Sequence, residues 1–88
     1  MNTLRRAAAW LPAVILPTAT FDQLWTILRA DSAAGVSALT WTLFLLANVG
    51  ALCLGRPDGR LGALQMALAF GLTALLDLAI VVRVLAER

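Results

Sequence analysis

Hydrophobic residues fill three long runs along the 88-residue chain, and charged residues gather between the runs and at the chain ends. The runs cover residues 7–28, 36–54 and 61–82, which is about 19 to 22 residues each. At a rise of about 1.5 Å per residue, such helices are roughly 28 to 33 Å long, which matches the hydrocarbon thickness of a bilayer. The pattern therefore predicts an all-α membrane protein, a bundle of three transmembrane helices in one domain over residues 1–88.

The composition supports placement in lipid. Hydrophobic residues make up 61% of the chain and charged residues 14%, and the mean hydropathy is +0.87. A soluble domain of this length has too little interior to hide so much apolar surface. We expect a multi-pass integral protein of the bacterial plasma membrane. A cleaved signal peptide after Arg5 and Arg6 is an alternative, but the apolar run continues to Leu28.

The charges do not indicate a nucleic-acid partner. The formal net charge is +2, and the arginines stand at helix boundaries and chain ends, as membrane anchors do. The N-terminus and the second loop carry four arginines and the opposite side carries three. A difference of one leaves the orientation in the membrane open under the positive-inside rule.

No pattern in the sequence indicates an enzyme. The chain has no histidine, and its one cysteine, Cys53, lies in an apolar run. There is no phosphate-binding glycine loop and no metal-ligand spacing. We therefore expect no catalytic residue, no bound metal and no cofactor.

Short connections between the runs predict a thin bundle that needs a second copy. The breaks at 30–35 and 55–60 force neighbouring helices to run antiparallel, so the first and third helices point the same way. Three helices leave little room for a site walled on all sides, and many transporters consist of two related halves. Two stripes of small residues favour close helix packing, either within one chain or between copies: Ala47, Ala51 and Gly55, and Ala63, Ala67 and Gly71.

Acidic residues within the predicted spans are candidates for function, because each costs free energy in lipid unless it finds a partner or water. Asp22 and Asp77 lie about equally far past the middle of two parallel helices. They are therefore expected at similar depth, either as a proton or substrate relay or as structural residues hydrogen-bonded to Gln23, to the backbone or to water.

Two neutral amides are the predicted centre of a binding site. Asn48 and Gln65 are expected at comparable depth in antiparallel helices, where they suit an uncharged, hydroxyl-rich ligand. Alternatively, they bond each other and hold two helices together. Pro12 and Pro17 predict a kink in the first helix, acting either as a hinge for alternating access or as a static bend.

The segment from Gln23 to Trp41 resembles the signature of the SemiSWEET and PQ-loop repeat family of small membrane transporters. The matching residues are Gln23, Arg29, Ser32, Gly35, Val36, Ser37, Thr40 and Trp41, and the resemblance continues at Asn48 and Gly55. It implies a bundle whose third helix lies between the other two, and a homodimer with the pathway on its two-fold axis. It also implies small sugars as substrates, an outside N-terminus and a cytoplasmic first loop.

The chain also departs from this pattern. Asp22 stands where the signature has proline, which leaves Pro17 as the nearest hinge. Ala51 and Leu54 replace the tryptophan and tyrosine of the second helix, and Gln65 is the nearest polar residue to the pocket asparagine of the third. The resemblance thus predicts hinge or gate residues at 17, 22 and 23, and substrate-binding residues at 48, 51 and 65.

Three functions are compatible with the sequence. The first is a homodimeric facilitator that moves a small neutral solute, such as a mono- or disaccharide, by alternating access. The second is a carrier that is proton-coupled or takes a cationic or amino-acid-like solute, using Asp22 and Asp77. The third is a membrane adaptor that transports nothing and packs on a larger partner through the stripe at 47, 51 and 55.

Overall fold

The computed structural model describes residues 3–88, which form three helical rods and contain no strand. Helix α1 covers Thr3–Ala30 and α2 covers Ala38–Leu54. The third rod is continuous and has three parts: α3 (Gly59–Met66), a π-helical segment η1 (Ala67–Leu72) and α4 (Thr73–Ala86).

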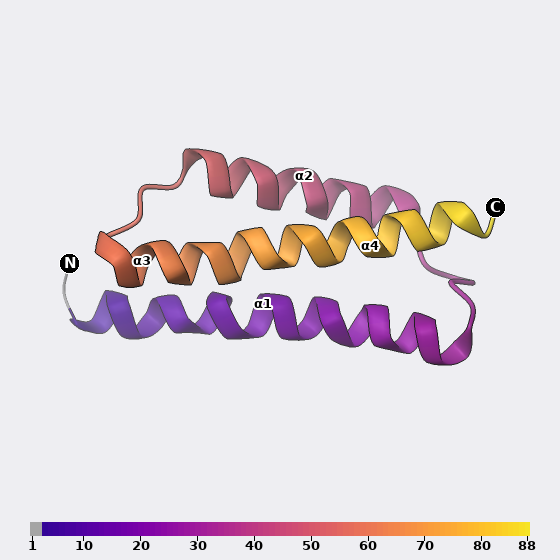
Figure 1. The fold of residues 1–88 in the computed structure, drawn as a ribbon, viewed down its shortest axis with the longest axis horizontal. Coiled ribbons are helices and arrows are strands. Elements are labelled where there is room, and N and C mark those ends of the chain that lie inside the picture. Colours follow the sequence, from indigo (N-terminus) through magenta and orange to yellow (C-terminus); the bar gives the residue numbers. More distant parts are fainter. Residues whose placement is uncertain (1–2) are drawn as a thin grey trace.

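The third rod lies between α1 and α2 (Figure 1), and it packs against both. The rods run antiparallel in chain order, so α1 and the third rod point the same way. The bundle is elongated, with extents of 46 × 22 × 16 Å. The family resemblance implies this central position for the third rod. Any site shared by all three helices must therefore include residues of this rod.

Two of the rods, Thr3–Ala30 and Gly59–Ala86, are long and apolar enough to cross a membrane. Both extend a few residues beyond the predicted runs at 7–28 and 61–82, because polar and charged residues add turns at their ends. Helix α2 begins at Ala38 instead of residue 36 and has 17 residues. It is therefore about 25 Å long, at the short end of the range for spanning helices.

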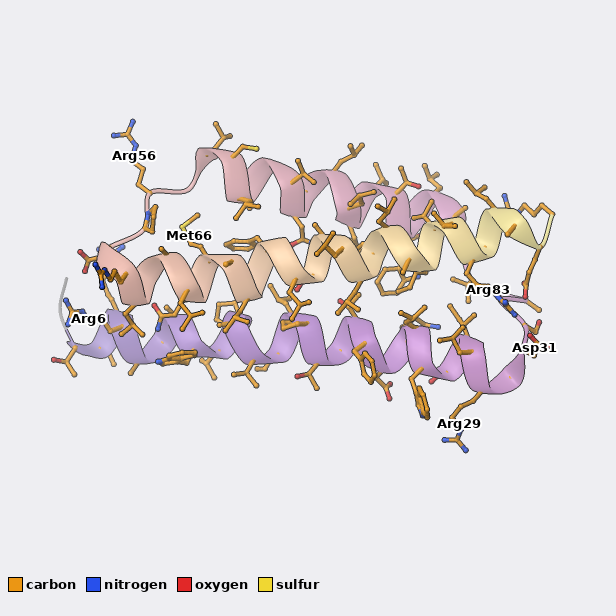
Figure 2. The ribbon with its side chains drawn as sticks, viewed as in Figure 1. Arg6, Arg29, Asp31, Arg56, Met66 and Arg83 are labelled. Carbon is orange, nitrogen blue, oxygen red and sulfur yellow. The ribbon has the colours of Figure 1, made fainter. Side chains whose placement is uncertain are left out.

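Large apolar side chains point outward on every rod (Figure 2). Helix α2 is the extreme case, since none of its residues is buried and Leu39, Leu43 and Leu46 are all exposed. In water such a surface would be an aggregation hazard, whereas in lipid it is the expected outer surface of a bundle.

A small core forms where the first loop meets the end of α4. Ile27, Ala33, Ile80 and Val84 are buried together there. Partly buried residues pack around them: Leu24, Val36, Ala38 and Trp41. The first loop is thus held to the bundle by apolar packing.

The first loop is built by a helix-ending motif and a helix-starting cap. The amide of Ser32 donates to the Ile27 carbonyl and that of Asp31 to the Leu28 carbonyl, both at 3.2 Å. This is the hydrogen-bond pattern of a Schellman motif, with Asp31 in the left-handed position at φ 50°. Ser37 then caps α2 by accepting from the Thr40 amide at 3.1 Å.

Both stripes of small residues contribute to contacts within the chain. A Cβ atom at Gly55 would overlap the side chain of Met66, and one at Gly71 would lie 3.7 Å from Leu52. The two glycines therefore allow close approach between α2 and the third rod. Ala63 and Ala67 are exposed, and a contact between copies remains a prediction for them.

Helix α1 runs unbroken through Pro12 and Pro17, and Pro17 is buried. A continuous helix can still bend at proline, so the kink at these residues stays a prediction. The third rod widens into the π-helical segment at residues 67–72, which no sequence pattern indicated. Such segments are often found at functional sites, and this one ends directly before Thr73.

Candidate functional site

A hydrogen bond between two of the predicted polar residues joins α2 to α4. The side-chain amide of Asn48 donates to Asp77 Oδ2 at 2.8 Å. Asp77 is completely buried, with 0% of its surface exposed. Asn48 was predicted to bind substrate and Asp77 to belong to a relay, and the structure brings these two residues together.

Beside this pair lies a hollow of about 290 Å³ that is shared by all three rods. It is lined by Leu16, Ala19 and Thr20 of α1, by Trp41, Phe44, Ala47 and Asn48 of α2, and by Thr73 and Asp77 of α4. On α1 the lining residues fall at the middle of the helix. We call this hollow the central pocket.

The floor of the central pocket contains polar atoms that lack partners. Thr73 and Asp77 are one turn apart on α4, and within the described residues neither Thr73 Oγ1 nor Asp77 Oδ1 has a hydrogen-bond partner. Thr20 differs, because its hydroxyl donates to the Leu16 carbonyl at 2.8 Å. Buried polar atoms without partners are costly, so a polar group that reached these two atoms would stabilise this part of the bundle.

Two aromatic rings of α2 also line the central pocket. Trp41 and Phe44 pack edge to face, with ring centroids 5.3 Å apart. In the sequence, Trp41 stands out only as part of the family signature, and no motif singles out Phe44. Their three-residue spacing, continued by Ala47 and Asn48, was the signal that this stretch of α2 shares one face.

Gln65 does not belong to the central pocket, which corrects the expectation that it lies level with Asn48. Asn48 pairs with Asp77, which is 12 residues beyond Gln65 and therefore about 18 Å further along the rod. The Gln65 amide instead donates to the Arg6 carbonyl at 2.9 Å. The two amides form neither one site nor a bond to each other.

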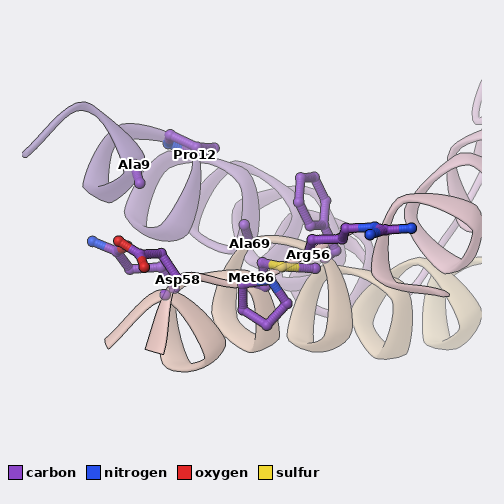
Figure 3. Close-up of a pocket in the computed structure, with 10 residues that line it drawn as sticks. Ala9, Pro12, Arg56, Asp58, Met66 and Ala69 are labelled. Carbon is purple, nitrogen blue, oxygen red and sulfur yellow. The ribbon is translucent and has the colours of Figure 1, made fainter. Parts of the chain in front are cut away.

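Gln65 lines a second hollow, of about 140 Å³, near the second loop (Figure 3). Arg56, Met66 and Ala69 lie around this hollow, with Pro12 of α1 on the other side. Gln65 is buried there, and its bond to Arg6 joins α3 to the beginning of α1. Its observed contact is therefore with the protein backbone.

The other predicted site residues lie outside the central pocket. Ala51 is half-buried one turn beyond Asn48 on α2, and Ala47 lines the pocket instead. Asp22 is exposed on α1, whereas Asp77 is buried, and no hydrogen bond joins these carboxylates within residues 3–88. The predicted relay is thus not formed by direct contact in one chain. Gln23 is half-buried.

A cluster of charges at one end of the bundle was not predicted. Arg83 contacts Asp31 at 2.6 Å and Glu87 at 3.4 Å. Glu87 also accepts from the Ala33 amide at 2.6 Å. Figure 2 shows Arg83 and Asp31 together at the end where the first loop meets the C-terminus. The cluster ties the first loop to α4, next to the small core.

The fold and the site together define a small all-helical bundle with two helices long and apolar enough to cross a membrane, and with a mainly apolar pocket between its three rods to which Thr20, Asn48, Thr73 and Asp77 contribute polar groups. Within the described part of the chain, no group of three or more acidic or cysteine residues could hold a metal ion. Comparisons with family models, curated proteins and solved structures found no match to this chain.

Proposed function

We propose that this chain crosses the bilayer three times and forms one half of a transporter for a small polar solute, with a second copy completing the pathway. Three antiparallel rods, short connections and outward apolar side chains support this proposal. The resemblance of the segment from Gln23 to Trp41 to the SemiSWEET signature supports the transporter class. On that basis, small sugars are the first solutes to test.

The single observation that carries the proposal is the hydrogen bond between half-buried Asn48 and buried Asp77 beside the central pocket. Ionisable and amide groups inside a membrane are costly, and they mark substrate or ion pathways by default. A pocket of about 290 Å³ is close to the lower end of the range for small-molecule sites. In this proposal, a solute that passes between the rods comes close to this pair.

The pocket also compensates for a departure from the family pattern. Ala51 removes an aromatic wall from α2, but Trp41 and Phe44 supply two rings at the Asn48 pocket. Aromatic faces pack well against apolar faces of a ring or chain, while Asn48 and Thr73 offer hydrogen bonds to hydroxyl groups.

A second copy is part of the proposal because one chain leaves the pocket incomplete. Helices α1 and α2 pack mainly on the third rod and not on each other. One chain therefore encloses the pocket on the sides formed by the third rod, α1 and α2, and leaves the side opposite the third rod open. Helix α2 has no buried residue, which leaves its outer face free for another copy. A homodimer would supply the missing wall.

Asp77 favours a second candidate, a carrier that is proton-coupled or takes a cationic solute. Such a carrier requires an acidic group in the pathway, and Asp77 lines the central pocket. Asp22 is exposed on the outside of α1, so in one chain this role rests on Asp77 alone.

Uptake by liposomes containing the purified protein tests the proposal. Labelled glucose and sucrose would be supplied at two pH values, because proton coupling makes uptake depend on pH and simple facilitation does not.

We expect Asn48→Ala to abolish uptake and Gln65→Ala to retain most of it, since Gln65 lies outside the central pocket. Equal loss in both variants would contradict the placement of the site. No flux of either sugar or of a small amine, from dimeric protein, would favour the adaptor.

A further inference from the structure

Asp77 is a buried acid that has no cationic partner among residues 3–88. The ion pairs found in the described residues lie at the two ends of the bundle, where arginines meet Asp31, Asp58 and Glu87. Asp77 has one neutral donor, Asn48, on Oδ2 and none on Oδ1. A buried carboxylate in this situation is costly unless a positive group compensates it.

The surroundings of Asp77 all favour a positive ligand. None of the described residues that line the central pocket is basic. Thr73 Oγ1, on the same floor, is a second oxygen without a partner. Trp41 and Phe44 present aromatic rings, whose faces attract cations through their negative π-systems. An acid, a free hydroxyl and two rings around one hollow thus share the same preference.

We propose that the central pocket takes a hydroxylated solute that carries a primary ammonium group. The proposal rests on the transporter function above and specifies the solute class. An ammonium has three N–H donors and no acceptor, which match the unpartnered oxygens of Asp77 and Thr73. Asn48 holds the other oxygen of Asp77 and so fixes the orientation of the carboxyl group. Trp41 and Phe44 contact the carbon skeleton of the solute.

A neutral sugar fits this pocket less well than its amine counterpart. It would fill the hollow and pack on the rings, but it would leave the charge of Asp77 uncompensated in a low-dielectric site. A proton on Asp77 would remove this disadvantage without any amine. The measured preference between an amine and its matched alcohol therefore separates the two cases.

Nuclear magnetic resonance of the tryptophan indole groups tests the proposal without relying on transport. The probes are glucamine, an amino-alditol that is charged at neutral pH, and glucitol, which has a hydroxyl in place of the ammonium. Trp41 lines the pocket, while Trp10 and Trp25 are exposed on α1. We expect glucamine to shift the Trp41 signal saturably, at concentrations about tenfold or more below those needed for glucitol.

Two charge-removing variants are matched controls. Asp77→Asn should remove the preference for glucamine, whereas Asp22→Asn, which removes an acid on the outer face of α1, should keep it. Equal shifts with both probes, no saturable shift, or a shift of Trp25 in place of Trp41 would overturn the proposal. Changes in the Trp10 and Trp25 signals would show that Asp77→Asn disturbs the fold. In that case, the comparison of glucamine with glucitol on the unaltered protein is the test of the proposal. If glucitol shifts Trp41 at the same or lower concentrations than glucamine while liposomes take up sugar, the ammonium proposal is wrong and the transporter function is still supported.

Discussion

Replacing Asn48 with alanine is expected to lower the free energy of unfolding by about 1–3 kcal/mol, the cost of leaving a buried polar group without its partner. Asp77 is completely buried and Asn48 is its one hydrogen-bond donor in the described chain. Hydrogen bonds between helices in lipid average only about 0.6 kcal/mol, but this substitution also leaves an acid unsatisfied. Equilibrium unfolding in detergent micelles, followed by circular dichroism, measures the change.

The same substitution in an Asp77→Leu background is the matched control. With no acid to satisfy, removal of the Asn48 amide should cost much less, and the difference between the two backgrounds is the coupling energy of the pair. Equal costs in both backgrounds would show that Asn48 stabilises the bundle by some route other than its bond to Asp77.

Replacing Ile80 with alanine is expected to cost about 2–5 kcal/mol, because it removes a fully buried side chain and leaves a cavity. Ile80 is 0% exposed and belongs to the core with Ile27, Ala33 and Val84. This core holds the first loop against α4, so the loop should also become more accessible to proteases. The measurement is equilibrium unfolding in the same micelles.

Leu75→Ala is the control for this prediction. Leu75 lies on the same helix, α4, but is 66% exposed, so its truncation removes few contacts within the protein and leaves no cavity. A loss of stability at Leu75 as large as that at Ile80 would contradict the assignment of this core.

Much of the fold is visible in the sequence because long apolar runs separated by charged residues are a simple pattern. Apolar runs bounded by arginines gave the three helices and their antiparallel order. The helix ends depend on local hydrogen bonds that hydropathy does not report. Ser37 caps α2 and delays its start to Ala38, while α1 runs on to Ala30, directly before Asp31 in its left-handed conformation.

The site was predicted only in part, because it depends on which residues of different helices meet. Asn48, Asp77 and Gln65 were each recognised as polar groups in apolar runs. Their partners follow from the depth at which the rods pack and from the π-helical segment at 67–72, which shifts the following residues around the rod relative to a regular α-helix. Neither property can be read from hydropathy, so Asn48 was matched with Gln65 instead of Asp77.

The charged end of the bundle illustrates the same limit. Asp31 and Arg83 are 52 residues apart in sequence, and nothing in their local patterns connects them. Their contact follows from the parallel course of α1 and α4, which brings the end of one helix to the end of the other (Figure 1). Parallel direction was predicted, but the pairing also requires the rods to end at the same level.

Solute protection of a cysteine placed in the central pocket is the most direct test of the account. Ala47 lines the pocket and the adjacent Leu46 is exposed outside its lining, so Ala47→Cys and Leu46→Cys are compared in a Cys53→Ser background. A methanethiosulfonate reagent modifies each cysteine in proteoliposomes, with and without excess glucose or glucamine. We expect modification at position 47 to block uptake and to be slowed by solute, and modification at position 46 to do neither. A modification rate at position 47 that neither solute changes would contradict the claim that the pocket beside Asn48 and Asp77 is a solute site.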